Sequence, residues 1–154
     1  MRRRDFVSLI CGATLVPRIA NAEAADKVWR IGNVFSTTSE RGASLAQGLK
    51  QSLADRGYVD GRNIVLALRF AGSQPNQIRN SITSLLSEID LLMVWSTIPG
   101  VIAKQLKVST PTVFVSVGAS VAIGVVQSLA HPGGNITGIS FEAATETYAK
   151  RLHF

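Results

Sequence analysis

The stretch VWRIGNVF, residues 28–35, decides the fold, because its apolar run is typical of a buried β-strand. Thr37 and Glu40 follow at the spacing of a capping box, in which each side chain bonds a free N–H of the first helical turn. The predicted helix runs to about Arg56, where Gly57 ends it. Its apolar stripe consists of Leu45, Leu49 and Leu53. The first unit is therefore a strand followed by a helix.

The same alternation repeats along the chain. Further strands are expected at residues 64–70, 91–95, 112–117 and 136–141. Pro75 opens a second helix, a third starts near Pro99, and a weaker one spans Ser120 to Leu129. The stripe of the second helix consists of Ile78, Ile82, Leu85, Leu86 and Ile89. The strand at 91–95 is continuously apolar, which predicts burial on both faces. The pattern predicts an α/β fold: a doubly wound parallel sheet with helices on both faces.

In such sheets, ligands bind beyond the carboxyl ends of the strands. The loops expected there, at residues 36–39, 71–73, 96–98 and 117–120, are rich in hydroxyl groups and glycine and hold no acid or histidine. This rim can bind a small polar ligand and offer helix N-termini to an anionic group, but it is poorly equipped for proton transfer. The candidate ligand-binding residues are Ser36, Thr37, Ser96, Thr97, Val117 and Gly118. The alternative is that the hydroxyl groups only cap helices.

The N-terminus has the layout of an export signal. Three arginines at positions 2–4 precede an apolar run at residues 6–16 and a segment of small residues. We expect a signal peptide at residues 1–24, of a twin-arginine-like type or of the general secretory type, cleaved near Ala22 or Ala24, and therefore a periplasmic location. The alternative is a short buried N-terminal helix.

Composition excludes several kinds of function. Cleavage after Ala22 turns 16 basic and 10 acidic residues into 12 and 9, so the net charge falls from +6 to +3 and no nucleic-acid footprint remains. The single cysteine, Cys11, lies in the leader, so the mature chain has neither a disulfide nor a thiolate nucleophile. His131 and His153 lack the spacing of metal ligands, and no dinucleotide motif is present, so neither a metal nor a cofactor is expected. No run after residue 25 is long enough for an integral membrane segment.

Three segments carry a resemblance to a known family: Arg30-Ile31-Gly32, GYVDGRNI at 57–64 and SLAHPGGNITG at 128–138. Together they resemble the ABC transporter substrate-binding proteins with the type I periplasmic-binding-protein fold. That resemblance implies two α/β lobes joined by a hinge, which close on a small solute and hand it to a membrane permease. Some relatives look like transporters of aromatic amino acids. This sequence departs from the family at 118–120, where Gly-Ala-Ser replaces the usual Gly-Asp-Pro.

The resemblance also implies a domain organisation. Residues 25–141 correspond to the N-terminal lobe, and 142–154 resemble the start of the crossover helix into a second lobe, which is missing. The expected function is the extracytoplasmic solute-binding component of an ABC importer, in an incomplete or truncated copy. Its partners would be a small polar, amino-acid-like solute and a membrane permease. A lone lobe is expected to be marginally stable and to bind weakly. The alternatives are a periplasmic ligand-sensing domain of the same fold, an enzyme, and a structural stub without activity.

Overall fold

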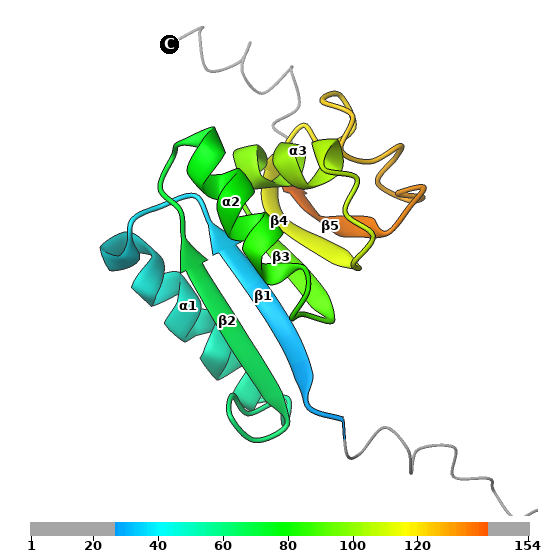
Figure 1. Ribbon diagram of the computed structural model, residues 1–154. Helices are drawn as coiled ribbons and strands as arrows, with labels where there is room; N and C mark the ends of the chain where they lie inside the picture. The colour runs from blue at the N-terminus through cyan, green and yellow to red at the C-terminus, as the bar shows by residue number, and fades with distance from the viewer. Residues whose placement is uncertain (1–26, 142–154) are drawn as a thin grey trace, which may run out of the picture.

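The computed structural model describes residues 27–141, which form one five-stranded sheet (Figure 1). Along the chain the elements are β1 (Trp29–Phe35), α1 (Ser39–Ala54), β2 (Ile64–Phe70), α2 (Pro75–Leu85), β3 (Leu91–Trp95), α3 (Thr97–Gln105), β4 (Thr112–Gly118) and β5 (Ile136–Phe141). All neighbouring strands are parallel, in the order β2-β1-β3-β4-β5. The five strands predicted from the sequence are confirmed to within one residue at each end.

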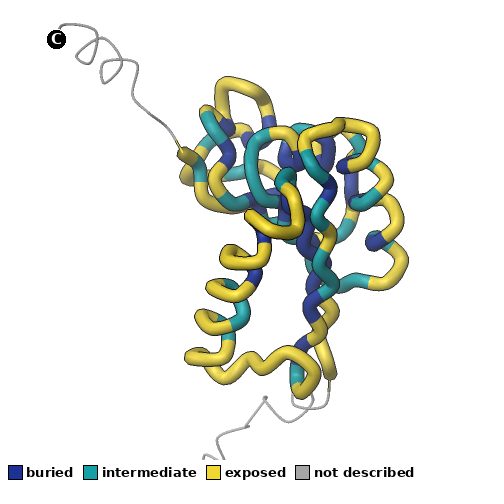
Figure 2. The backbone as a smooth tube through the Cα atoms, turned by 90° about the vertical axis from the view of Figure 1, so that its left-hand side faces the viewer, coloured by how far each residue is buried: buried dark blue, intermediate teal, exposed yellow. Residues whose placement is uncertain are grey.

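The helices lie on both faces of the sheet. Helices α2 and α3 cover one face and α1 lies on the other (Figures 1 and 2). This arrangement confirms the doubly wound α/β fold. Helices connect the strands because two parallel neighbours need a crossover segment that returns the chain to the same end of the sheet.

The larger core lies between the sheet and helices α2 and α3. Ile78, Ile82 and Leu85 of α2 are fully buried, which confirms three of the five residues of the predicted stripe, whereas Leu86 and Ile89 lie beyond the end of α2 and are half-buried. They pack in one cluster with the sheet residues Val34, Leu92, Val94 and Phe114. Complete burial of one such side chain contributes about 1.5–3 kcal/mol. This face of the sheet therefore supplies most of the apolar burial.

Helix α1 differs from its prediction in two ways. Its N-cap is Thr38, which makes no side-chain capping bond, so the capping box of Thr37 and Glu40 is wrong. Its buried residues are Gly42 and Ala46, whereas the side chain of Leu45 is 48% exposed. The small residues face the sheet because the ring of Phe70 occupies the space beside Gly42.

Strand β3 is not buried on both faces as predicted. Leu92 and Val94 are fully buried, but Leu91, Met93 and Trp95, which point to the α1 side, are half-buried. The continuous apolar run therefore does not imply equal cover on both sides. Helix α1 covers only part of its face.

The helix predicted at 120–129 does not form. The segment makes a short series of turns, in which the N–H groups of Val125 and Val126 both bond the carbonyl oxygen of Ser120. Gly124, with a φ of 74°, interrupts the helical course. Val125 and Val126 are nevertheless buried in the larger core. The segment closes that core without a helix.

Asp60 ties helix α1 to the start of β2. Its carboxylate accepts a hydrogen bond from the N–H of Leu66 at 2.9 Å and forms an ion pair with Lys50 at 2.9 Å. Burial by itself raises the pKa of the Asp60 carboxyl, but the bonds from Lys50 and Leu66 outweigh it, so the pKa lies below its usual value. Asp60 therefore stabilises the fold above about pH 4, and this contribution is lost as the pH falls through the lowered pKa.

We expect Asp60→Asn to lower the free energy of unfolding at pH 7 by less than about 1 kcal/mol, because the ion pair is partly exposed to solvent. Urea denaturation at pH 7 and at about pH 3 measures the effect. The difference in the free energy of unfolding between variant and parent should be smaller at the lower pH. If this difference in the free energy of unfolding stayed constant or increased in acid, the assigned role of the Asp60 carboxylate would be contradicted.

Candidate functional site

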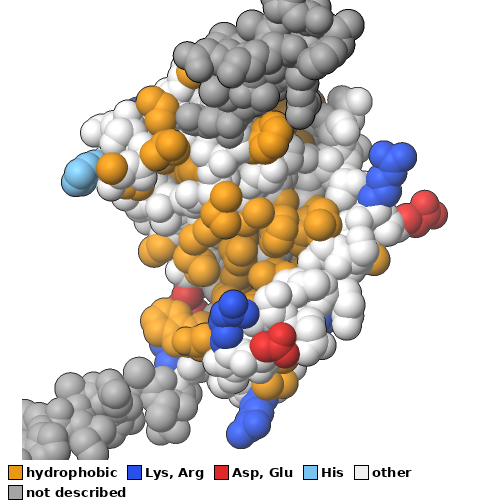
Figure 3. Space-filling model, turned by 180° about the vertical axis from the view of Figure 1, so that it is seen from behind, with side chains coloured by type: hydrophobic (Ala, Val, Ile, Leu, Met, Phe, Trp, Pro, Cys, Tyr) orange, Lys and Arg blue, Asp and Glu red, His pale blue; other side chains and the backbone are white. Residues whose placement is uncertain are grey.

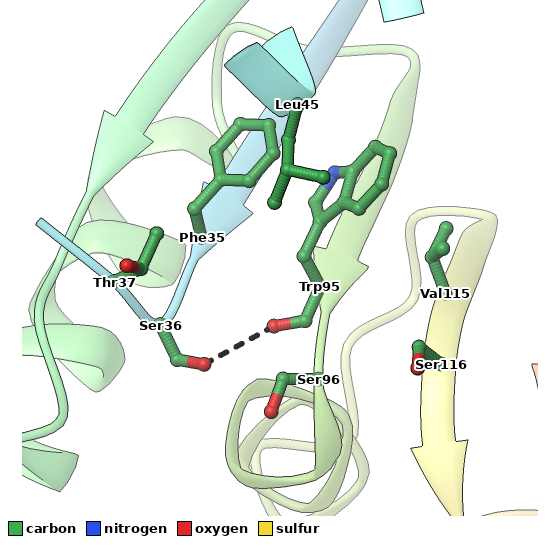
Figure 4. Close-up of a pocket in the computed structure, with 8 residues that line it drawn as sticks. All are labelled: Phe35, Ser36, Thr37, Leu45, Trp95, Ser96, Val115 and Ser116. Atoms are coloured by element: carbon green, nitrogen blue, oxygen red, sulfur yellow. Dashed lines mark hydrogen bonds between the residues drawn. The ribbon is translucent and has the colours of Figure 1, made fainter. Parts of the chain in front are cut away.

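A cavity of about 440 Å³ opens at the carboxyl ends of β1, β3 and β4, on the α1 side of the sheet. Figure 4 shows the side chains around it. The lining residues are Phe35, Ser36, Thr37, Leu45, Trp95, Ser96, Val115 and Ser116. The cavity lies where the fold predicts a ligand, beside the switch of strand order between β1 and β3.

Aromatic rings form one wall of the cavity. The Phe35 ring stacks against Phe70 on one side, with centroids 5.2 Å apart, and against Trp95 on the other, at 4.9 Å. The indole N–H of Trp95 donates to the side-chain oxygen of Asn33, which is fully buried, at 3.3 Å. The stack and this bond hold the indole ring in one orientation, which makes it a rigid surface for a flat, apolar group.

A bulge in β4 brings a hydroxyl group into the cavity. The register between β4 and β5 shifts between Val115 and Val117, so Ser116 is an extra residue in the strand, with a φ of 58°. Ser96, at the end of β3, has a φ of 89°. Positive φ is unfavourable for residues other than glycine, and such residues cluster at functional sites. Two of the four non-glycine residues with positive φ within 27–141 line this cavity.

The cavity also faces the starts of two helices. The N-caps of α1 and α3 are Thr38 and Ser96, and neither makes a side-chain capping bond. The first N–H groups of both helices are thus not satisfied by their cap side chains and can receive an anionic or carbonyl oxygen. None of the described lining residues is charged, so recognition rests on hydroxyl groups, backbone dipoles and apolar contact.

The structure separates the six predicted site residues into groups. Ser36, Thr37 and Ser96 line the cavity, and the Ser36 hydroxyl donates to the carbonyl oxygen of Trp95 at 3.3 Å. The Thr97 hydroxyl accepts a hydrogen bond from the N–H of Gly118 at 3.0 Å, which ties the start of α3 to the end of β4. These two residues support the rim but do not line the cavity.

Val117 does not line the cavity either. It is fully buried on the opposite side of β4, where a Cβ atom added to Gly100 of α3 would lie 2.9 Å from its Cγ2 atom. The bulge at Ser116 reverses the alternation of faces at this point, so that Val117 turns toward the core and Ser116 toward the cavity. A count of alternating positions along β4 could not reveal that reversal.

Sequence reasoning missed five lining residues: Phe35, Leu45, Trp95, Val115 and Ser116. Phe35 and Trp95 end their strands, and that position was the available signal, but the prediction took its site residues from the loops that follow the strands. Neither tryptophan is a fully buried core residue, because Trp95 lines the cavity and Trp29 is 44% exposed. No sequence signal marks Leu45 or Ser116.

Comparison with known proteins now identifies the family. Residues 37–151 match the family described as ABC transporter substrate binding protein. The chain belongs to this family. Its members are substrate-binding proteins and not enzymes. No curated protein sequence is similar enough to count as a relative.

Solved structures share the fold. A ligand-free, open substrate-binding protein with adhesive properties from Clostridium difficile has a TM-score of 0.70 and 24% identity, over 81% of this chain and 43% of its own. A conserved domain protein from Vibrio cholerae O1 biovar El Tor has a TM-score of 0.72 and 23% identity, over 82% of this chain and 43% of its own. An ABC domain from Streptococcus pneumonia in complex with L-Trp has a TM-score of 0.67 and 19% identity, over 74% of this chain and 39% of its own.

The chain thus spans less than half the length of the solved structures that it matches. The resemblance to a single lobe of the type I periplasmic-binding-protein fold is confirmed. Within residues 27–141, no helix is both long and apolar enough to cross a membrane.

Proposed function

We propose that this chain is the N-terminal lobe of the extracytoplasmic solute-binding component of an ABC importer. The observation that carries the proposal is the cavity at the carboxyl ends of β1, β3 and β4, in a chain of the substrate-binding family. The cavity is open on one side, as expected for half of a cleft whose other wall belongs to a second lobe. The second lobe would follow the segment 142–154, which lies outside the described residues.

The solute that suits this cavity is small, polar at one end and flat at the other, as an amino acid is. The exposed side of the Trp95 indole and the side chain of Leu45 suit an apolar group. The hydroxyl groups of Ser36, Ser96 and Ser116, with the uncapped starts of α1 and α3, suit a carboxylate. The complex of the S. pneumonia domain with L-Trp supports the same class of solute.

Two further parts of the proposal concern location and partner. The twin-arginine leader expected at residues 1–24 would direct the chain to the periplasm, with cleavage near Ala22 or Ala24. This leader lies outside the described residues. The family implies a membrane permease as the protein that receives the solute.

The experiment is calorimetric titration of residues 25–154 with a panel of L-amino acids that includes L-tryptophan. Binding by at least one of them is expected, with weak affinity because one side of the solute stays in water. We expect Leu45→Asp to weaken that binding at least about tenfold, because it places a charged carboxylate against the apolar group of the bound solute.

Gln47→Asp is the matched control. It introduces the same charge on the same exposed helix, at a residue that does not line the cavity, and should leave binding unchanged. Failure of every amino acid to bind, or equal losses in the two variants, would overturn the assignment of this cavity as the solute site.

A further inference from the structure

Another cavity, of about 410 Å³, lies at the amino ends of β4 and β5, whereas the proposed solute cavity lies at the carboxyl ends of the strands. It opens between the end of α3 and the loop that enters β5 (Figure 1). Its lining residues are Lys104, Lys107, Val108, Gly133, Gly134, Asn135 and Ile136. We call it the lysine cavity, because its lining carries two positive charges at pH 7 and no negative one.

The two lysines of this cavity have no carboxylate partner in the described part of the chain. The other two lysines within residues 27–141 each form an ion pair, at 2.7 and 2.9 Å: Lys27 with Asp90, and Lys50 with Asp60. Figure 3 likewise shows several basic side chains beside acidic ones on the α1 side of the molecule. The charges of Lys104 and Lys107 are therefore free to attract an anion from solution.

Lysines near the end of a helix often bond its last carbonyl groups. At the end of α3 backbone N–H groups already make such bonds. The N–H of Lys107 donates to the carbonyl oxygen of Lys104 at 3.1 Å, and the N–H of Val108 donates to that of Ala103 at 3.4 Å. This pair of bonds is a Schellman motif, which ends the helix without the help of a side chain. The two ammonium groups are therefore not required as helix caps.

Lys107 stands at the position of this motif that glycine usually takes. Its φ is 49°, in the left-handed region, which is less favourable for lysine than for glycine. A side chain that is kept at an unfavourable backbone position indicates a role beyond the fold. The Lys107 side chain is exposed and lines the cavity, so we expect it to contact the ligand.

A glycine turn forms the opposite wall of the lysine cavity. Within residues 27–141, the N–H groups of Gly133 and Gly134 make no hydrogen bond. Gly133 has a φ of 78°, and the side chain of Gln127 fills the space that a Cβ atom would take. A residue with a side chain therefore does not fit, and the backbone itself lines the cavity. Consecutive free N–H groups in a turn can bind an anion.

The side chain of Asn135 joins the two walls. Its amide group donates to the carbonyl oxygens of Val108 at 2.6 Å and of Thr110 at 2.9 Å. On the other side of the turn, the N–H of Gln127 donates to the carbonyl oxygen of Pro132 at 3.1 Å. These bonds fix the turn before any ligand arrives, so binding would lose little conformational entropy of the backbone.

We propose that the lysine cavity binds a phosphate group, through the ammonium groups of Lys104 and Lys107 and the N–H groups of Gly133 and Gly134. The oxygen atoms of a phosphate group point in several directions and are strong acceptors, so they can bond donors on both walls at once. The volume admits a free phosphate ion and also an esterified one, such as a lipid headgroup. The inference does not depend on the proposed function, because it concerns the other edge of the sheet.

The test is a titration of the isotope-labelled full chain with inorganic phosphate at pH 7.5 and constant ionic strength, followed by NMR. The amide signals of Gly133 and Gly134 should shift saturably, with half-saturation below about 10 mM. Lys104→Gln and Lys107→Gln should each weaken binding at least about fivefold, because each removes a charge-assisted hydrogen bond. Arg62→Gln is the matched control: it removes one positive charge from an exposed turn outside the cavity, and the affinity should stay within about twofold.

Lys107→Gly separates loss of the site from loss of the fold. It should weaken phosphate binding as much as Lys107→Gln does, without lowering the melting temperature, because glycine is favoured at this φ. A lower melting temperature of this variant would contradict the backbone position assigned to Lys107.

A second probe, sn-glycero-3-phosphoglycerol, is the headgroup of phosphatidylglycerol without its acyl chains. Tighter binding of this diester than of inorganic phosphate would assign the site to a lipid headgroup, and the reverse to the free ion. The proposal would be overturned if neither probe caused a saturable shift, if both lysine-to-glutamine variants bound like the parent, or if Arg62→Gln lost as much affinity as they do.

Discussion

Gly138→Ala should lower the free energy of unfolding by about 2–4 kcal/mol, the largest loss expected from adding a single methyl group to this chain. Gly138 lies in β5 opposite Phe114 of β4. A Cβ atom built at Gly138 meets the backbone carbonyl oxygen of Phe114 and lies 2.7 Å from its backbone nitrogen. Backbone atoms of a paired strand cannot rotate away as a side chain can. The methyl group must therefore push β5 from its place beside β4.

Urea denaturation followed by circular dichroism measures this loss. Gly48→Ala is the matched control, because Gly48 is exposed within α1 and an added Cβ atom meets nothing within 4 Å. Alanine is favoured over glycine inside a helix by about 0.5–1 kcal/mol, so this control should stabilise the protein. If Gly138→Ala proved neutral, β5 could not lie in the described register against β4.

Phe35→Ala should cost about 3–5 kcal/mol. The Phe35 side chain is fully buried and stacks between the rings of Phe70 and Trp95. Its removal leaves a cavity in the aromatic stack and frees the Trp95 indole to tilt. The substitution should therefore weaken solute binding as well as stability, because Trp95 forms a wall of the solute cavity.

Phe141→Ala separates this effect from a general sensitivity to loss of a phenylalanine. Phe141 is 64% exposed at the end of β5, so its replacement should change the free energy of unfolding by less than about 0.5 kcal/mol. The same urea titration, with tryptophan fluorescence as a second signal, reports both stability and the packing of Trp95. Comparable losses in the two phenylalanine variants would show that the stack at Phe35 does not stabilise the fold.

Local sequence patterns were sufficient for the strands and for helix α2. Strand β2 was predicted with its observed ends, 64–70, because an Asp-Gly turn precedes it and Gly72 follows it. Helix α2 was predicted from Pro75 and a stripe that the structure buries. Local signals failed where a neighbour in space determined the outcome. Helix α1 turns Gly42 toward the sheet because Phe70 fills that space, and no residue of α1 itself carries that information.

The predictions for the site divide in the same way, between positions that local sequence indicated and positions that a neighbour in space determined. Loop positions predicted Ser36, Thr37 and Ser96 as ligand-binding residues, and all three line the cavity because carboxyl ends of parallel strands meet at one edge. Ser116 lines the cavity in place of the predicted Val117 because of one extra residue in β4 relative to β5. A bulge is a property of two paired strands, so a single strand's alternation cannot predict it.

The sequence by itself determined the order of the five strands and the first three helices, the parallel sheet, the edge that carries the cavity and the family, because turn residues, periodicity and motifs are encoded within short stretches. Only the tertiary structure decided which side chains line the cavity, and that α1 leaves the sheet bare over β3, β4 and β5. The physical reason is that the solvent exposure of a side chain, and the side of the sheet toward which it points, depend on the volume of neighbouring residues that are far away in the chain. That information exists only once the strands are paired and the helices are packed.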